Sequence, residues 1–341
     1  MSSSTPTAPA SDQLPTVKLD RLPLLLLPVL ALAALPLVGS FSTWVTLTFA
    51  GLAMGMIIFI MASGLTLVFG LMDVLNFGHG IFITLGAFLA TSLLGLMPNW
   101  TASESLTLNL LAVVPTMLVA MAVAGLLGLV FERLIIRPVY GNPLKQIMIT
   151  MGGMIVGQEL IKVFWGPQAI PLPLPGALHG SLLLGGDAAV EKYRMLAVLL
   201  GLLVFAAMFW VLSRTKIGLL IRAGVQDREM VESLGYRVRR LFLAVFVAGS
   251  ALAGLGGVMW GLYQQTVTPE IGGEVNVLLF IVIIIGGLGS VGGCFIGARL
   301  VGLVANYAGF LAPKVALFSD ILLMVIVLLW RPQGLYPVVK Q

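Results

Sequence analysis

The chain has 341 residues, of which 59% are hydrophobic and only 10% are charged, and its formal net charge is +5. A soluble domain carries about 25% charged residues, so this composition excludes an ordinary soluble protein and indicates an integral membrane protein. One cysteine, Cys294, excludes a disulfide framework within the chain, and two histidines are too few for most metal sites. The basic residues flank apolar runs, which is typical of membrane loops, so no nucleic-acid partner is expected.

Residues 1 to 21 are rich in Ser, Thr and Pro and show no apolar period, which predicts a disordered cytoplasmic tail. A membrane span needs about 20 apolar residues, and about ten such runs follow this tail. We place them near residues 22 to 39, 44 to 68, 80 to 97, 108 to 131, 144 to 164, 194 to 213, 241 to 263, 277 to 297, 298 to 312 and 315 to 330. The prediction is an all-α, polytopic membrane protein with a transmembrane domain at 22 to 331 and a cytoplasmic tail at 332 to 341.

The one long polar segment is at residues 213 to 240, SRTKIGLLIRAGVQDREMVESLGYRVRR. It contains seven of the nineteen basic residues: Arg214, Lys216, Arg222, Arg228, Arg237, Arg239 and Arg240. Since basic loops stay on the inner side, residues 214 to 240 are predicted to form a cytoplasmic loop, with both termini cytoplasmic. The longest outer loop is then at residues 166 to 193, where alternating prolines favour a stiff, extended path. It is either a docking surface or a connector.

A short helix is predicted inside the cytoplasmic loop, from Arg228 to Leu234. Asp227 is a good N-cap, and Gly235 suits the left-handed residue that ends a helix. Glu229 adds negative charge at the first turn, while Met230, Val231 and Leu234 form one apolar face. Such a helix packs either on the protein's own spans or in a groove of a partner.

Two apolar segments are interrupted. Between residues 64 and 86, the polar residues Asp73, Asn76 and His79 are three apart, and Gly78 favours a broken helix or a re-entrant turn. Irregular backbone at membrane depth survives only inside protein or along a water-filled cavity, which predicts a substrate path here; a plain loop with a structural histidine is the alternative. Residues 286 to 297, GGLGSVGGCFIG, repeat this pattern loosely, which is consistent with an internal duplication.

Charges within the spans are few. Glu159 and Lys162 are spaced to form a pair, and Asp320 fits the start of the last span. These residues do not resemble the chain of membrane acids expected of a proton-coupled pump. A membrane enzyme would need a converging nucleophile, base or metal set, and only His79 with Asp73 and Asn76 comes near one. No enzymatic activity is therefore expected.

Four segments resemble the permeases of branched-chain amino acid ABC importers. They are SGLTLVFGLMDVLNFGHGIFITLGAF, RAGVQDREMVESLGYRVRRLFLAVFVAGSALAGLGGVMWG, IIIGGLGSVGGCFIGA and LLWRPQGLYP. The resemblance covers residues 44 to about 337 and implies a permease domain in a bacterial inner membrane. One difference is the loop AGVQDREMVESLGY, which replaces an Asn-Pro-containing loop, so the pairing with ATPases is expected to be particular to this system.

The resemblance implies partners: a second, paralogous permease, two cytoplasmic ATPases and a periplasmic solute-binding protein. It also implies that the predicted short helix is a coupling helix, formed by Asp227, Arg228, Glu229, Met230, Val231, Glu232, Ser233, Leu234 and Gly235. The chain has no G-x-x-x-x-G-K-[ST] loop, so ATP and Mg²⁺ are expected on the ATPases and no cofactor or metal on this chain.

The transported solute is expected to be a branched-chain or related amino acid. Similar permeases carry urea, short amides and aromatic acids, so these remain alternatives, and an ion-coupled secondary transporter is a second one. The interrupted segments indicate a translocation pathway lined by Asn76, Phe77, His79, Gly289 and Ser290.

Overall fold

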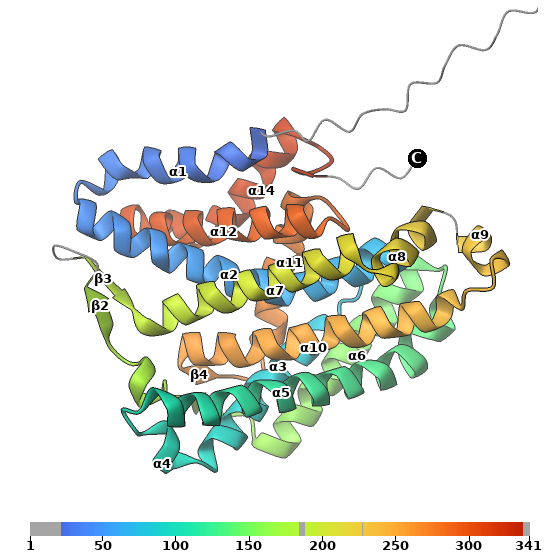
Figure 1. The fold of residues 1–341 in the computed structure, drawn as a ribbon, viewed down its shortest axis with the longest axis horizontal. Coiled ribbons are helices and arrows are strands. Elements are labelled where there is room, and N and C mark those ends of the chain that lie inside the picture. Colours follow the sequence, from blue (N-terminus) through green and yellow to red (C-terminus); the bar gives the residue numbers. More distant parts are fainter. Residues whose placement is uncertain (1–21, 184–187, 227, 337–341) are drawn as a thin grey trace, which may run out of the picture.

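The computed structural model describes residues 22–183, 188–226 and 228–336, and the tail expected at residues 1 to 21 lies outside them. Within the described residues the chain is a helical bundle (Figure 1) with ten apolar helices, six long enough to cross a membrane and four shorter. They are α1 (Leu22–Val38), α2 (Phe41–Met72), α3 (His79–Gly95), α5 (Leu106–Phe131), α6 (Pro143–Trp165), α7 (Lys192–Arg214), α10 (Val238–Gln264), α11 (Ile271–Gly286), α12 (Val291–Leu311) and α14 (Ser319–Trp330). The expected all-α, polytopic membrane protein is confirmed.

Short elements lie at opposite ends of the bundle. Figure 1 shows α8 and α9 at one end and α4 with strands β2, β3 and β4 at the other. The short elements are α4 (Pro98–Thr101), the π-helix η1 (Glu132–Ile136), the 3-10 helices η2 (Arg137–Val139) and η3 (Gly176–Leu178), β1 (Ile170–Pro171), β2 (Ser181–Leu183), β3 (Ala189–Glu191), α8 (Lys216–Gln226), α9 (Arg228–Ser233), β4 (Thr266–Val267) and α13 (Pro313–Ala316). Strand β1 pairs antiparallel with β4, and β2 pairs antiparallel with β3.

The boundaries expected for the last three spans are wrong. Helix α11 begins at Ile271, six residues before the predicted start at residue 277, and it ends at Gly286 instead of residue 297. Helix α12 begins at Val291, within the segment assigned to the preceding span, and α14 begins at Ser319 instead of residue 315. Hydropathy alone cannot locate these ends, because the apolar character continues across the interruption.

The interruption between α11 and α12 is short because backbone geometry and a cap define it. Gly287 and Gly289 have φ angles of 99° and 79°, a region that favours glycine. The Ser290 hydroxyl then accepts a hydrogen bond from the backbone N–H of Gly293 at 3.1 Å, which caps the start of α12. The break is therefore confined to residues 287–290, and the later glycines of the segment belong to α12.

Helices α2 and α12 pack in opposite directions through close backbone contacts. A β-carbon on Gly51 would lie 2.8 Å from the Cα of Leu303, and one on Gly70 would lie 2.8 Å from the Cα of Gly289. As residue numbers rise along α2, those of the facing residues fall along α12. Small residues permit this approach, which is how membrane helices associate without a hydrophobic driving force.

Helix α10 occupies the centre of the bundle, packed on α2, α3 and α5. The backbone of Gly249 lies directly against that of Gly64 in α2, and the backbone of Gly254 lies against Gly86 in α3. No side chain fits between these backbones. Helix α10 is therefore close-packed on α2 and α3 at the level of the backbone.

The long loop at residues 166 to 193 folds back on one end of the bundle. The backbone N–H of Leu172 donates to the carbonyl of Gln265 at 2.9 Å, and the N–H of Ala177 donates to Oδ1 of Asn109 at 2.7 Å. Leu172 is buried. The proline-rich path expected from the sequence is thus tied to α5 and to the end of α10.

Candidate functional site

The short helix expected in the polar loop is present as α9, Arg228–Ser233. Its end is the one predicted, because Gly235 has a φ angle of 85°. The N–H of Leu234 donates to the Met230 carbonyl, and the N–H of Tyr236 donates to the Val231 carbonyl at 3.3 Å. The proposed N-cap, Asp227, lies outside the described residues, and the side chains of Arg228 and Glu229 are likewise not described.

The apolar residues of this segment divide between two environments. Val231 is 3% exposed and belongs to the protein's own core, whereas Met230 is 60% and Leu234 is 68% exposed. Tyr236, just beyond the helix, is 53% exposed. Exposed apolar side chains gathered on a polar loop are typical of an interaction site. One buried side chain therefore attaches α9 to the bundle, and its neighbours remain available to a partner. Glu232 and Ser233 are exposed beside them.

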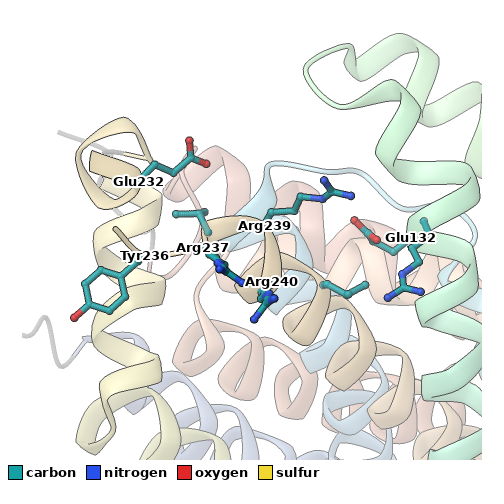
Figure 2. A pocket seen from close by; sticks show the side chains of 9 residues that line it. Glu132, Glu232, Tyr236, Arg237, Arg239 and Arg240 are labelled. Carbon is teal, nitrogen blue, oxygen red and sulfur yellow. The ribbon is translucent and has the colours of Figure 1, made fainter. Parts of the chain in front are cut away.

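A hollow of about 430 Å³ lies beside α9 (Figure 2). It is lined by Glu132, Arg133, Glu232, Tyr236, Arg237, Val238, Arg239, Arg240 and Leu243. Four of these are arginines and two are glutamates, so the lining carries a positive charge. Figure 2 shows Arg239 extending toward Glu132. Glu132 itself is buried and accepts a hydrogen bond from the Tyr140 hydroxyl at 2.9 Å. The hollow therefore presents a basic surface next to the exposed apolar residues of α9.

The position of α9 in the chain connects it to the centre of the bundle. Only a few residues separate α9 from α10, and the first three residues of α10 line the hollow. Val238, at the start of α10, is 1% exposed. Helix α10 is in turn in backbone contact with α2 and α3, the helices that flank the first interruption.

The first interruption is at residues 73–78, between α2 and α3. Asp73 ends α2 in the left-handed region, with a φ angle of 54°. The Asn76 side-chain oxygen accepts the N–H of Gly78 at 3.0 Å, which forms a tight turn. Asn76 is fully buried, and its Nδ2 atom has no protein partner among the described residues. The broken helix expected near residues 70 to 80 is therefore confirmed.

Distant helices complete the hydrogen bonds of this turn. The N–H of Phe77 donates to Thr150 Oγ1 of α6 at 3.2 Å, and its carbonyl accepts from Asn276 Nδ2 of α11 at 2.8 Å. Its ring also contacts that of Phe280 of α11. His79 is 1% exposed, and its Nε2 lies 3.0 Å from the Met61 carbonyl of α2.

Residues near the carboxyl end of the chain hold the second interruption. The N–H of Leu335 donates to the Ile285 carbonyl and that of Tyr336 to the Gly286 carbonyl, both at 2.9 Å. Leu335 is 1% exposed. The first residues of the expected carboxyl-terminal tail thus pack on the end of α11, and residues 337–341 lie outside the described part.

The predicted site residues fall into three separate places. Asn76, Phe77 and His79 belong to the first interruption, which Phe77 joins to Asn276 of α11, whereas Gly289 and Ser290 lie just beyond the end of α11. At 1.5 Å per residue, Asn276 and Gly286 are about 15 Å apart along α11. The coupling residues of α9 form the third group, on the cytoplasmic loop predicted from the sequence.

Three residues were not predicted from the sequence: Thr150 and Asn276, which bond Phe77 in the first interruption, and Arg299, which lies inside α12. Nothing local marks Thr150 or Asn276, because their contacts arise only from packing. Arg299 carried a signal, since it is a charge inside the apolar helix α12. Among the described residues no group of three or more His, Cys, Asp and Glu side chains could hold a metal ion.

Comparison with known proteins gives a family match over most of the chain. The family model for the branched-chain amino acid transport system, permease component, matches residues 47–330. The chain is 29% identical over 296 residues to the high-affinity branched-chain amino acid transport system permease protein BraD of Pseudomonas aeruginosa, covering 84% of this chain and 93% of that protein. It is 25% identical over 299 residues to the corresponding LivH protein of Escherichia coli, with the same coverage of each chain.

A partial match is found to a second permease of the Escherichia coli system, LivM. It is 30% identical over 145 residues, which covers 41% of this chain and 33% of LivM. No solved structure matches the chain.

Proposed function

The chain belongs to the family of branched-chain amino acid transport permeases, and we propose that it carries a branched-chain or closely related amino acid across a bacterial inner membrane. As a member of this family it is the permease component of an ABC transport system and is not itself catalytic. The solute is inferred from the relatives BraD and LivH, whose names specify branched-chain amino acids.

The proposed assembly contains a second permease, two ATPases and a solute-binding protein. The partial match to LivM supports a second permease that is related to this chain but different from it. ATP and Mg²⁺ are then bound by the ATPases, because this chain has no P-loop sequence. The basic loop around α9 supports a cytoplasmic position for that end of the bundle and for both termini.

The observation that carries the coupling role is the division of the α9 side chains. Val231 anchors the helix to its own core, while Met230 and Leu234 are exposed for an apolar groove on an ATPase. The arginines of the adjacent hollow add a surface for acidic side chains of the same partner. Exposed apolar side chains beside a basic surface together favour a protein partner for α9.

Transport then follows from alternating access. ATP binds one arrangement of the ATPases more tightly than the other. Only this difference in affinity can shift the equilibrium between the two arrangements. The shift displaces α9, hence α10, and hence α2 and α3 through their backbone contacts. The first interruption lies between α2 and α3, and the second contacts the last turns of α2 through Gly289 and Gly70; irregular backbone at both places permits rearrangement. We assign Asn76, Phe77, His79, Gly289 and Ser290 to the border of the pathway on this basis.

The test is co-purification of the assembled importer, expressed from its gene cluster, with Leu234→Asp in α9. The control is Leu183→Asp in β2, which is 73% exposed at the opposite end of the bundle. We expect the ATPases to be lost from Leu234→Asp and retained by Leu183→Asp, with both permeases folded. Retention of the ATPases by Leu234→Asp contradicts the coupling role of α9.

The solute is tested separately in proteoliposomes that contain the wild-type importer and its binding protein. We expect ATP-dependent uptake of leucine, isoleucine or valine. Uptake of urea, short amides or aromatic acids in their place would contradict the proposed solute and leave the coupling role intact.

A further inference from the structure

Arg299 is a cation in the interior of an apolar helix. It is the ninth of the 21 residues of α12, so it lies about 12 Å from the start of the helix and about 18 Å from its end. A charged side chain at such a depth is costly in a membrane and usually faces a partner or a water-filled cavity. Both helix ends lie beyond the reach of one side chain, so snorkelling does not account for Arg299.

The guanidinium group is held in a fixed position. Its Nε–H donates to the Phe295 carbonyl at 3.2 Å, and its Cζ lies 3.8 Å from the centre of the Phe295 ring. That ring stacks on Phe205 of α7, with centroids 3.8 Å apart and planes at 10°, and it meets Phe59 of α2 edge-on. Helices α7 and α12 both pack on α2 (Figure 1), so residues of three helices hold the ring on which this cation lies.

The positive charge has no counter-charge within the described residues. The ion pairs found there involve Lys162 and Arg194, and none involves Arg299. Its two terminal nitrogens donate no hydrogen bond to the described part of the protein, since its contacts are those through Nε and the ring. The side chain is half-buried. A planar pair of donors is therefore left without a partner in the described part of the protein, and such a pair can bind a carboxylate with two hydrogen bonds.

The surroundings favour a small amphiphilic carboxylate as the ligand. The guanidinium group covers one face of the Phe295 ring and the half-buried ring of Phe205 covers the other, while the 61% exposed side chain of Phe209 continues this aromatic cluster along α7. The cation therefore lies at the edge of an apolar, aromatic environment, which suits an aliphatic group attached to a carboxylate bound by Arg299. An amino acid with an apolar side chain has both parts.

We propose that Arg299 lines the translocation pathway and binds the carboxylate of the transported amino acid. This inference rests on the proposed transport function and adds a specificity residue to it. An acidic residue of the second permease is the competing ligand, and the experiments separate the two.

The first experiment measures leucine uptake and ATP hydrolysis by the whole importer in proteoliposomes. Arg299→Gln is expected to lower uptake by at least about tenfold, as for the loss of one member of a charged pair. Arg299→Lys is expected to retain part of the uptake, because it keeps the charge and loses the paired donors. The control is Lys314→Gln in the short helix after α12, an equal change of charge on an exposed side chain.

Assembly of the complex decides between the ligands. With Arg299→Gln, both permeases and the ATPases are expected to co-purify at wild-type yield. Separation of the two permeases would show that Arg299 pairs with the second permease, and it would overturn the proposal. Uptake within about twofold of wild type would overturn it as well.

The second experiment does not depend on knowing the solute. Arg299→Cys is made in a Cys294→Ala background, and the whole importer is treated with a charged, membrane-impermeant methanethiosulfonate. We expect modification at position 299, slowed by the transported solute, and none for Leu126→Cys, a 65% exposed position on α5. No modification at position 299 would place it in lipid or in a dry interface and overturn the proposal. Failure of leucine uptake in the wild type would instead contradict only the proposed solute.

Discussion

Gly70 and Gly289 are in backbone contact, although one lies near the end of α2 and the other in the break before α12. A β-carbon on Gly70 would be 2.8 Å from the Cα of Gly289, and Gly289 has a φ angle of 79°. Two segments that the sequence marks as unusual, far apart along the chain, therefore meet in space. Their contact links the end of α2 to the start of α12.

Gly70→Ala is expected to separate these two backbones. The added methyl group overlaps main-chain atoms, which cannot rotate away, so the free energy of unfolding should fall by about 1–3 kcal/mol. Thermal unfolding of the purified permease complex in detergent measures this loss. The control is Gly292→Ala, because a β-carbon at Gly292 meets no atom within 4 Å. Equal thermal stability of the two variants would show that the Gly70 contact is dispensable.

Val231→Ala is expected to uncouple ATP hydrolysis from transport. The change shortens the buried side chain that attaches α9 to the bundle and leaves the exposed surface intact. The ATPases should therefore still co-purify, while leucine uptake per ATP hydrolysed falls several-fold. Met230→Ala is the comparison, since it removes an exposed side chain and should weaken ATPase retention instead. Identical behaviour of the two variants would contradict the division of roles within α9.

Thr150→Val is expected to destabilise the turn at residues 73–78. The threonine hydroxyl accepts the Phe77 N–H, and its replacement leaves that donor without this partner at a cost of about 1–3 kcal/mol. Chemical denaturation in detergent measures the difference. Thr116→Val is the matched control, because Thr116 is equally buried and its hydroxyl donates only within its own helix. A loss for Thr116→Val as large as for Thr150→Val would show that the contact with Phe77 contributes nothing.

Leu335→Ala is expected to loosen the second interruption. Leu335 is 1% exposed, and its backbone N–H bonds the end of α11, so truncation should cost about 2–5 kcal/mol of stability. Leu288→Ala provides the control in the same break, because Leu288 is 43% exposed. The measurement is again the unfolding temperature of the complex. An unchanged temperature for Leu335→Ala would mean that the carboxyl-terminal residues do not hold α11.

Parts of the candidate site were predictable from local chemistry. The helix near Arg228 and its end at Gly235 follow from a capping pattern within one short segment. The break at residues 73–78 follows from polar residues and glycines inside an apolar run. What could not be predicted is that Val231 is buried while Met230 and Leu234 are exposed, because all three are apolar and lie within one short segment.

The membrane class and the apolar helices follow from hydropathy alone, because a bilayer requires long apolar segments with internally bonded backbones. Packing between distant segments decided the rest. Asn276 and Phe77 are 199 residues apart, yet their hydrogen bond anchors α11 to the first interruption. The contact of Gly70 with Gly289 and the stacking of Phe205 on the Phe295 ring beside the half-buried Arg299 arise in the same way. These features depend on contacts between segments that are far apart in the sequence. A local sequence pattern carries no information about such contacts.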